Sequence, residues 1–137
     1  MSVLSKPRTS ATVAMKTLAA AALVFATSAL ALEDQHFEFQ TTGDLARVCG
    51  VEDDATGALP AVFACRAFIE ATMQYHDAIS DYKQLKPLTC PPQGTTIADG
   101  RAAFLAWART NADDAKLMGE LPVVGLVRAL AAKYPCK

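Results

Sequence analysis

The stretch that decides the fold is ALPAVFACRAFIEATMQYHDAISDYKQ, residues 58–84. Apolar side chains recur along it at steps of three or four residues, which is the period of one buried face of an α-helix. Pro60 suits the first turn of such a helix, because backbone N–H groups there have no partner within the helix. The sequence therefore predicts one long helix from about Ala58 to Gln84. Its expected buried stripe contains Val62, Cys65, Ile69, Met73, His76 and Ile79, widened by Phe63, Ala67 and Ala71.

A shorter helix is predicted before the long one. Thr41 and Thr42 offer a hydroxyl cap with Asp44 in the first turn, and the helix should end near Cys49, where Gly50 follows. These signals place a helix of about two turns ahead of the long one.

Two more helices are predicted after the long one. Pro87 ends the long helix, and the connector through Cys90, Pro91 and Pro92 must be extended. Thr96 and Asp99 have the spacing of a capping box for a helix that runs to about Asn111. Inward positions on that helix are Ile97, Arg101, Phe104, Leu105 and Ala108.

The last helix is expected from near Leu121 to Lys133, with Pro122 in its first turn. Residues 111–120 have room for an extra turn. No segment alternates apolar and polar residues at period two, so the predicted fold class is all-α, a small bundle of four to five helices. The side chains expected to point inward from the last helix are Leu121, Val124, Val127 and Leu130.

Residues 1–31 have the features of a cleavable signal peptide. Basic residues precede an uncharged run, residues 17–32, that is shorter than the about 20 apolar residues a membrane helix needs. The run ends in Ala29-Leu30-Ala31, the small-x-small pattern of a cleavage site, so cleavage is expected after Ala31. A membrane anchor is the alternative interpretation. Met1 and Met15 are both candidate start residues, because Met15 begins a complete signal by itself.

Removal of the signal leaves one domain, residues 32–137, with 10 basic and 14 acidic residues and a net charge of −4. This charge disfavours nucleic acids and anionic membranes as partners and is compatible with a basic protein partner. We therefore expect a periplasmic protein that has no membrane contact once the signal is removed.

Four cysteines, Cys49, Cys65, Cys90 and Cys136, follow the predicted signal. In a small exported domain an even number of cysteines usually forms disulfides, and the absence of C-x-x-C disfavours redox and zinc motifs. Three pairings are open. We favour Cys49–Cys65 and Cys90–Cys136, because each would tie the end of a predicted helix to a neighbouring segment. Each bridge would contribute roughly 3–4 kcal/mol in the chain-entropy model.

The sequence offers no catalytic residues, metal ligands or cofactor motif. Ser80 is the only serine after residue 31 and lies within the long predicted helix, and His76 is expected at the edge of the core. The loop Glu52-Asp53-Asp54 is instead a candidate partner-binding element, because it is charged and lies between two helices. A merely solvated surface turn is the alternative interpretation of this loop.

The order of several short motifs resembles a known family. These motifs are Phe39-x-x-x-Gly43-Asp44-Leu45-x-x-x-Cys49, Cys65-x-x-Phe68-Ile69, Cys90-Pro91, Gly94-Thr95-Thr96, Phe104-Leu105, Ala129-Leu130 and Tyr134-Pro135-Cys136. The set resembles the Tai/Rap immunity proteins, which are exported helical proteins that neutralise toxins delivered by type VI secretion systems. The resemblance implies a non-catalytic protein that occludes the active site of a peptidoglycan amidase effector, often as a homodimer. It assigns no effector-binding residues.

Two other functions are compatible with a small exported helical domain. One is a periplasmic acid-stress chaperone of the HdeA type, although two disulfides would resist the unfolding that such a chaperone needs. The other is a helical adaptor without a toxin partner, which shares only the domain.

Overall fold

Five α-helices form the regular structure of residues 37–137, the part of the chain that the computed structural model describes. The predicted all-α class is confirmed, and residues 111–120 contain the extra turn as α4. The predicted signal peptide and the predicted cleavage site after Ala31 lie outside the described residues. In chain order the helices are α1 Thr42–Cys49, α2 Leu59–Lys83, α3 Ile97–Thr110, α4 Ala115–Met118 and α5 Pro122–Lys133.

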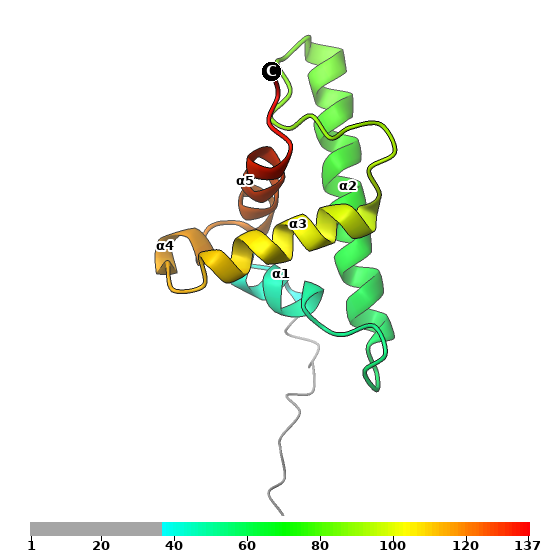
Figure 1. The fold of residues 1–137 in the computed structure, drawn as a ribbon, viewed down its shortest axis with the longest axis vertical. Helices are drawn as coiled ribbons and strands as arrows, with labels where there is room; N and C mark the ends of the chain where they lie inside the picture. Colours follow the sequence, from blue (N-terminus) through cyan, green and yellow to red (C-terminus); the bar gives the residue numbers. More distant parts are fainter. Residues whose placement is uncertain (1–36) are drawn as a thin grey trace, which may run out of the picture.

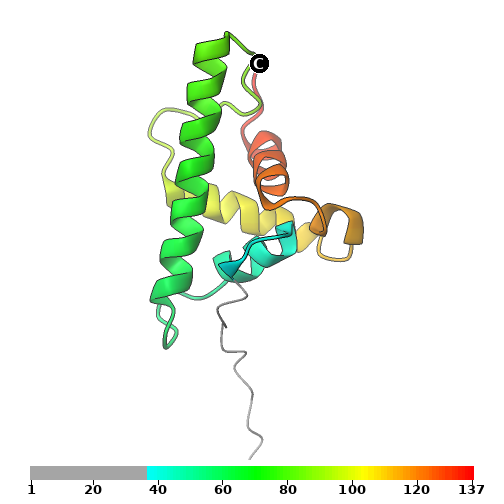
Figure 2. The ribbon, with the colours of Figure 1, turned by 180° about the vertical axis from the view of Figure 1, so that it is seen from behind.

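The helices are arranged around α1 and α3. Helix α2 runs along one side of the molecule, α3 crosses it, and α5 rises on the other side toward the C-terminus (Figure 1). Seen from behind, α2 and α5 again stand apart above α1 (Figure 2). Both pack mainly against α1 and α3 rather than against each other. The upper half of α2 and the helix α5 therefore border a hollow, which side chains of both helices line.

The core lies where α1, α2, α3 and α5 meet. Phe39, which precedes α1, extends this core by packing edge-on against Phe68 of α2, with ring centroids 5.4 Å apart. None of the described helices is both long and apolar enough to span a bilayer. The buried side chains at the centre are Leu45, Cys49, Cys65, Ile69, Phe104, Leu126, Ala129 and Leu130.

The two disulfides have the pairing that the sequence favoured. The Cys49–Cys65 bridge links the end of α1 to α2 and is buried in the core. The Cys90–Cys136 bridge links the proline-rich connector to the C-terminal tail. The backbone N–H of Cys90 also donates to the carbonyl oxygen of Tyr134 at 2.9 Å, so that the connector and the tail are joined twice.

Helices α1 and α3 begin with the capping boxes that the sequence indicated. Thr41 and Asp44 exchange hydrogen bonds at the start of α1: each backbone N–H donates to the other side chain, at 2.9 and 3.1 Å. Thr96 and Asp99 do the same at the start of α3, at 2.8 and 3.2 Å. Each pair satisfies two backbone donors that the helix itself leaves without partners.

The expected width of the buried stripe on α2 was wrong. Phe63 is 64% exposed, and Ala67 and Ala71 are exposed as well. The reason is that α2 packs mainly against α1 and α3, which cover one narrow line of its residues. The helix also ends at Lys83, earlier than expected, because Gln84 adopts a left-handed conformation with φ 52°.

The inward face of α5 was also mispredicted in part. Leu130 is buried, but Leu121 is 63% and Val124 40% exposed. The helix is turned so that Gly125 faces α1, where its missing side chain lets the backbone approach Thr42. The residues of α5 that this rotation buries are Pro122, Gly125, Leu126, Ala129 and Leu130.

Thr42 is the partner in this close approach. Its side chain is fully buried, and its hydroxyl donates toward the carbonyl oxygens of Glu120 and Leu121 at 3.1 and 3.2 Å. Its backbone N–H donates to the same Glu120 carbonyl at 2.8 Å. The start of α5 is therefore bonded directly to the start of α1.

The substitution Gly125→Ala tests this packing. A Cβ at position 125 would lie 2.8 Å from Cβ of Thr42, so α1 or α5 would have to shift. We expect the free energy of unfolding to fall by about 1–3 kcal/mol, the usual cost of overpacking. Denaturant unfolding measures it, and Gly100→Ala in α3 is the control, because its Cβ would meet Ile69 at an ordinary 3.5 Å. Equal stability of the two variants would contradict the account.

The capping boxes predict how stability depends on pH. Burial raises the pKa of Asp44, but hydrogen bonds from Thr41 and the neighbouring Arg47 outweigh it and hold this pKa below its ordinary value. Hydrogen bonds from the backbone and side chain of Thr96 lower the pKa of Asp99. The stabilisation is therefore fully present above the unfolded carboxyl pKa of about 3.9 and is lost as the pH falls through the lower folded values.

We accordingly expect the double variant Asp44→Asn/Asp99→Asn to lose less stability than the unchanged protein when the pH falls from about 5 to 2. Asp113→Asn, in an exposed turn, is the control and should follow the unchanged protein. Thermal unfolding at several pH values measures the effect. Parallel pH profiles for the double variant and the unchanged protein would show that the two caps contribute nothing to it.

Candidate functional site

The acidic loop, residues 50–58, joins α1 to α2 at one end of the molecule, where it projects beyond the helices (Figure 1). It turns twice, through hydrogen bonds from the N–H of Ala55 to Glu52 and from the N–H of Ala58 to Ala55, at 3.1 and 3.0 Å. Gly57 has a φ of 77°, a left-handed conformation that costs residues with a Cβ conformational free energy. The Cys49–Cys65 bridge closes the segment at its base.

Arg101 of α3 holds the first half of the acidic loop in place. Its Nε donates to the carbonyl oxygen of Cys49 at 2.7 Å and its Nη2 to that of Val51 at 2.6 Å. Its Nη1 donates to the carboxylate of Asp53, also at 2.6 Å. The carbonyl groups at the end of a helix have no partner within it and carry partial negative charge, so a guanidinium group suits this position.

The three acidic side chains differ in their surroundings. Asp53 is paired with Arg101 although its side chain is 70% exposed. Glu52 and Asp54 are exposed and form no ion pair among the described residues. The loop therefore offers the two unpaired carboxylates of Glu52 and Asp54, while the pair between Asp53 and Arg101 helps to hold the backbone that carries them.

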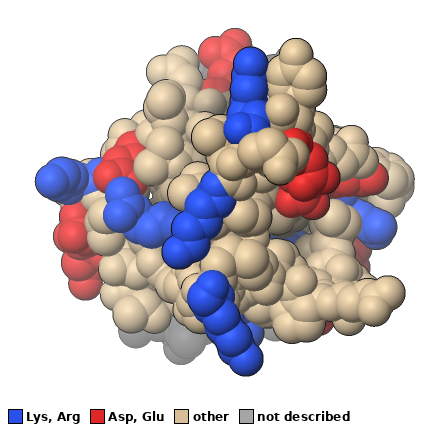
Figure 3. Space-filling view, turned by 90° about the horizontal axis from the view of Figure 1, so that it is seen from above, with Lys and Arg blue, Asp and Glu red and all other residues tan. Residues whose placement is uncertain are grey.

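A shallow hollow of about 560 Å³ lies between the acidic loop and α3. The three carboxylates border it on the loop side, and Arg101 and Arg109 border it on the α3 side. The opposite end of the molecule, seen from above, carries basic and acidic side chains side by side (Figure 3).

The described residues hold neither a cluster of metal ligands nor a free thiol. In residues 37–137 no three His, Cys, Asp or Glu side chains gather closely enough to hold a metal ion. All four cysteines are in disulfides, so none supplies a thiolate. What the site presents is a rigid loop with exposed carboxylates beside a shallow hollow.

Comparison with known protein families assigns the chain to one of them. The sequence profile of the Rap1a immunity proteins matches residues 41–136, which spans α1 to the last cysteine. The chain belongs to the Rap1a immunity protein family. The resemblance seen in the motifs is thereby confirmed. No curated protein and no solved structure matched significantly.

Three other side chains of this Rap1a-family chain, His76, Ser80 and Trp107, do not line the hollow beside the acidic loop. His76 lies within α2 and is half-buried. Its Nδ1 is 2.8 Å from the carboxylate of Asp77, and its Nε2 accepts the N–H of Leu88 at 3.0 Å. Ser80 is buried within α2, far along the helix from the acidic loop. Trp107 packs partly buried against the core. None of them contributes to the site.

Arg101 is the residue of the site whose role the sequence analysis missed. It was placed among the inward positions of α3, but its bonds to the acidic loop were not foreseen. An arginine on the inward face of a helix is itself a signal, because a buried guanidinium needs partners for its donors.

The substitution Arg101→Lys tests the hold on the acidic loop. Lysine keeps the charge but cannot bond two carbonyl oxygens and a carboxylate in one plane. We expect the free energy of unfolding to fall by about 1.5–3 kcal/mol and the amides of residues 51–56 to exchange hydrogen faster. Asp53→Asn is the control and should cost less than about 1 kcal/mol, because that pair is largely exposed. Equal losses would mean that the carbonyl bonds contribute little.

Proposed function

We propose that the domain acts in the periplasm as an immunity protein that binds a peptidoglycan amidase delivered by a type VI secretion system and occludes its active site. Membership of the Rap1a immunity family supports a protein effector as the partner. The two disulfides are consistent with export, since disulfides persist in oxidising compartments. Occlusion requires no catalysis by this chain.

The observation that carries the proposal is the rigidity of the acidic loop. Arg101 and the Cys49–Cys65 bridge order its backbone before any partner binds. A preformed loop loses little conformational entropy on binding, so more of the contact energy appears as affinity. Glu52 and Asp54 then offer carboxylates to basic groups around the cleft of the effector, which speeds association and favours the cognate partner.

Two exposed apolar side chains lie next to the carboxylates of the acidic loop in the sequence. Leu59 and Phe63 lie one helical turn apart at the start of α2, directly after the acidic loop, and are 65% and 64% exposed. Interfaces commonly combine a buried aromatic anchor with a charged, more exposed rim. We therefore place the effector-binding surface on the acidic loop and the first turns of α2.

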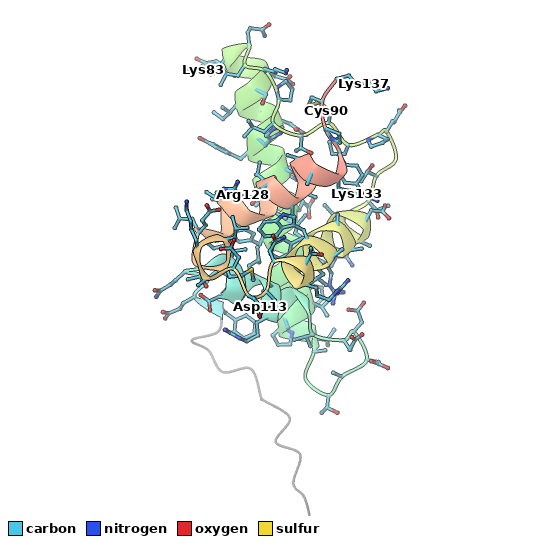
Figure 4. All side chains as sticks on the ribbon, turned by 60° about the vertical axis from the view of Figure 1, so that its left-hand side comes forward. Lys83, Cys90, Asp113, Arg128, Lys133 and Lys137 are labelled. Atoms are coloured by element: carbon cyan, nitrogen blue, oxygen red, sulfur yellow. A yellow bond between two sulfur atoms is a disulfide. The ribbon has the colours of Figure 1, made fainter. Side chains whose placement is uncertain are left out.

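Co-expression tests the proposal. A type VI amidase effector from the same organism is directed to the periplasm, with and without the immunity protein, and growth is recorded. We expect the unchanged chain to restore growth, and Asp54→Lys to slow association with the purified amidase by about 10-fold at low salt. Asp113→Lys is the matched control, since it reverses the charge of another exposed aspartate, between α3 and α4 (Figure 4).

Two outcomes would count against the proposal in different ways. Failure of the unchanged chain both to restore growth and to form a complex would exclude that amidase as the target. Rescue that is intact, with equal association rates for Asp54→Lys and Asp113→Lys, would retain the immunity function and remove the acidic loop from the interface.

A further inference from the structure

The connector that follows α2 runs back along the end of that helix and is anchored on both sides of residues 86–88. Before them, the N–H of Leu85 donates to the carbonyl oxygen of Ser80 at 2.9 Å. After them, the N–H of Cys90 donates to the carbonyl oxygen of Tyr134 at 2.9 Å, and a disulfide ties Cys90 to the C-terminal tail. Both anchors consist of backbone hydrogen bonds and a disulfide, which contain no titratable group.

One side chain of α2 holds the segment between these anchors. The N–H of Leu88 donates to Nε2 of His76 at 3.0 Å. In the described part of the chain this is the one hydrogen bond between residues 86–88 and α2. Pro87 has no N–H that could add a second. The Leu88 residue is 65% exposed, so burial of its side chain holds the segment only weakly. The position of residues 86–88 on the helix therefore depends on His76.

The two hydrogen bonds of His76 define the protonation state in which it can hold the segment. Nε2 accepts a hydrogen bond, so it carries no proton. The proton of the neutral ring then lies on Nδ1, which is 2.8 Å from the carboxylate of Asp77. A second proton can enter the ring only at Nε2, where it would point at the N–H of Leu88. Two donors would then face each other, and the hydrogen bond would be lost.

The surroundings of the ring contain charges of both signs. The side chain of His76 is 8% exposed, and the charged group in direct contact with it is the carboxylate of Asp77, which stabilises a positive ring. The residues of α5 that line the hollow beside His76 are Val123 and Val127, which are uncharged. The other titratable or charged groups that line this hollow or the adjoining one are Tyr75 of α2, Lys86 of the connector and Arg128 of α5, which is paired with Glu120.

We propose that His76 is an acid-sensitive latch, which holds residues 86–88 on the end of α2 and releases them when its ring takes up a second proton. Histidine is the side chain whose charge ordinarily changes between about pH 5 and 8. Because Leu85 and Cys90 stay anchored, the release is a local opening between two fixed points. It widens the hollow of about 310 Å³ that Leu88 lines together with Val123 and Val127.

The latch is separate from the acidic loop. From Leu59, the first residue of α2, to His76 the helix rises by about 25 Å. Arg101 and the Cys49–Cys65 bridge, which hold the acidic loop, have no group that titrates between about pH 5 and 8. The latch thus goes beyond the proposed immunity function, and growth rescue, recorded separately, distinguishes failure of the one from failure of the other.

Amide hydrogen exchange of the protein, followed by NMR at about pH 7.5 and about pH 5, tests the latch. Each rate is compared with the intrinsic rate of an unfolded chain at the same pH. We expect the protection of the Leu88 N–H to fall by about 10-fold or more at the lower pH, because each pH unit changes the ratio of the two ring forms about 10-fold. The N–H groups of Leu85 and Cys90 are internal controls and should keep their protection, because backbone carbonyls accept them.

A variant without the imidazole should lose this pH dependence. His76→Gln is neutral at both pH values, so the protection of the Leu88 N–H should be the same at both. His36→Gln is the matched control, since it makes the same change at the other histidine of the chain, and should behave like the unchanged protein. Circular dichroism checks that each variant is folded. If His76→Gln does not fold, the comparison of the three amides in the unchanged protein still decides.

Three results would overturn the latch. One is equal protection of the Leu88 N–H at the two pH values. Another is a parallel fall at Leu85, Leu88 and Cys90, which would mean a general loosening of the connector. The third is a fall in folded His76→Gln as large as in the unchanged protein.

Discussion

The acidic loop depends on the hydrogen bonds that Arg101 donates to the backbone at the end of α1 and just after it. They give partners to the carbonyl oxygens of Cys49 and Val51 and join α3 to the acidic loop. The Cys49–Cys65 bridge acts at the same place from the side of α2. Three helices thus converge on one short segment, which has no regular structure of its own. The backbone of the first half of the loop is held by these neighbours, and the exposed carboxylates of Glu52 and Asp54 project from it or directly follow it.

A second constraint shapes the other end. Gly125 lets α5 approach Thr42 so closely that α5 turns its glycine and alanine line toward α1 and α3. Leu121 and Val124 are then left on the outside, opposite the upper half of α2. Because α2 and α5 pack on α1 and α3 rather than on each other, the space between them stays open and apolar. The close packing at α1 and the open space between α2 and α5 therefore have one cause.

Local signals in the sequence predicted the helices, whereas packing decided what they bury. The caps at Thr41 and Thr96 depend only on neighbouring residues, so they could be recognised in advance. The inward face of α5 could not be predicted in the same way. Apolar periodicity selects valines and leucines as the buried residues and gives no sign that Gly125 makes the closest contact with α1. Phe63 was misplaced since nothing in the sequence says how few neighbours α2 has. The acidic loop was foreseen as exposed, but its order comes from Arg101, 48 residues away from Asp53.

Hydrogen exchange of the protein, alone and in complex with the cognate amidase, tests the central claim most directly. That claim is that one rigid end, the acidic loop with the start of α2, meets the effector. The account predicts slow exchange in residues 50–58 of the free protein relative to an ordinary surface loop, and added protection in residues 50–66 on binding. Fast exchange in the free loop, or protection confined to residues 75–88 and α5, would contradict it.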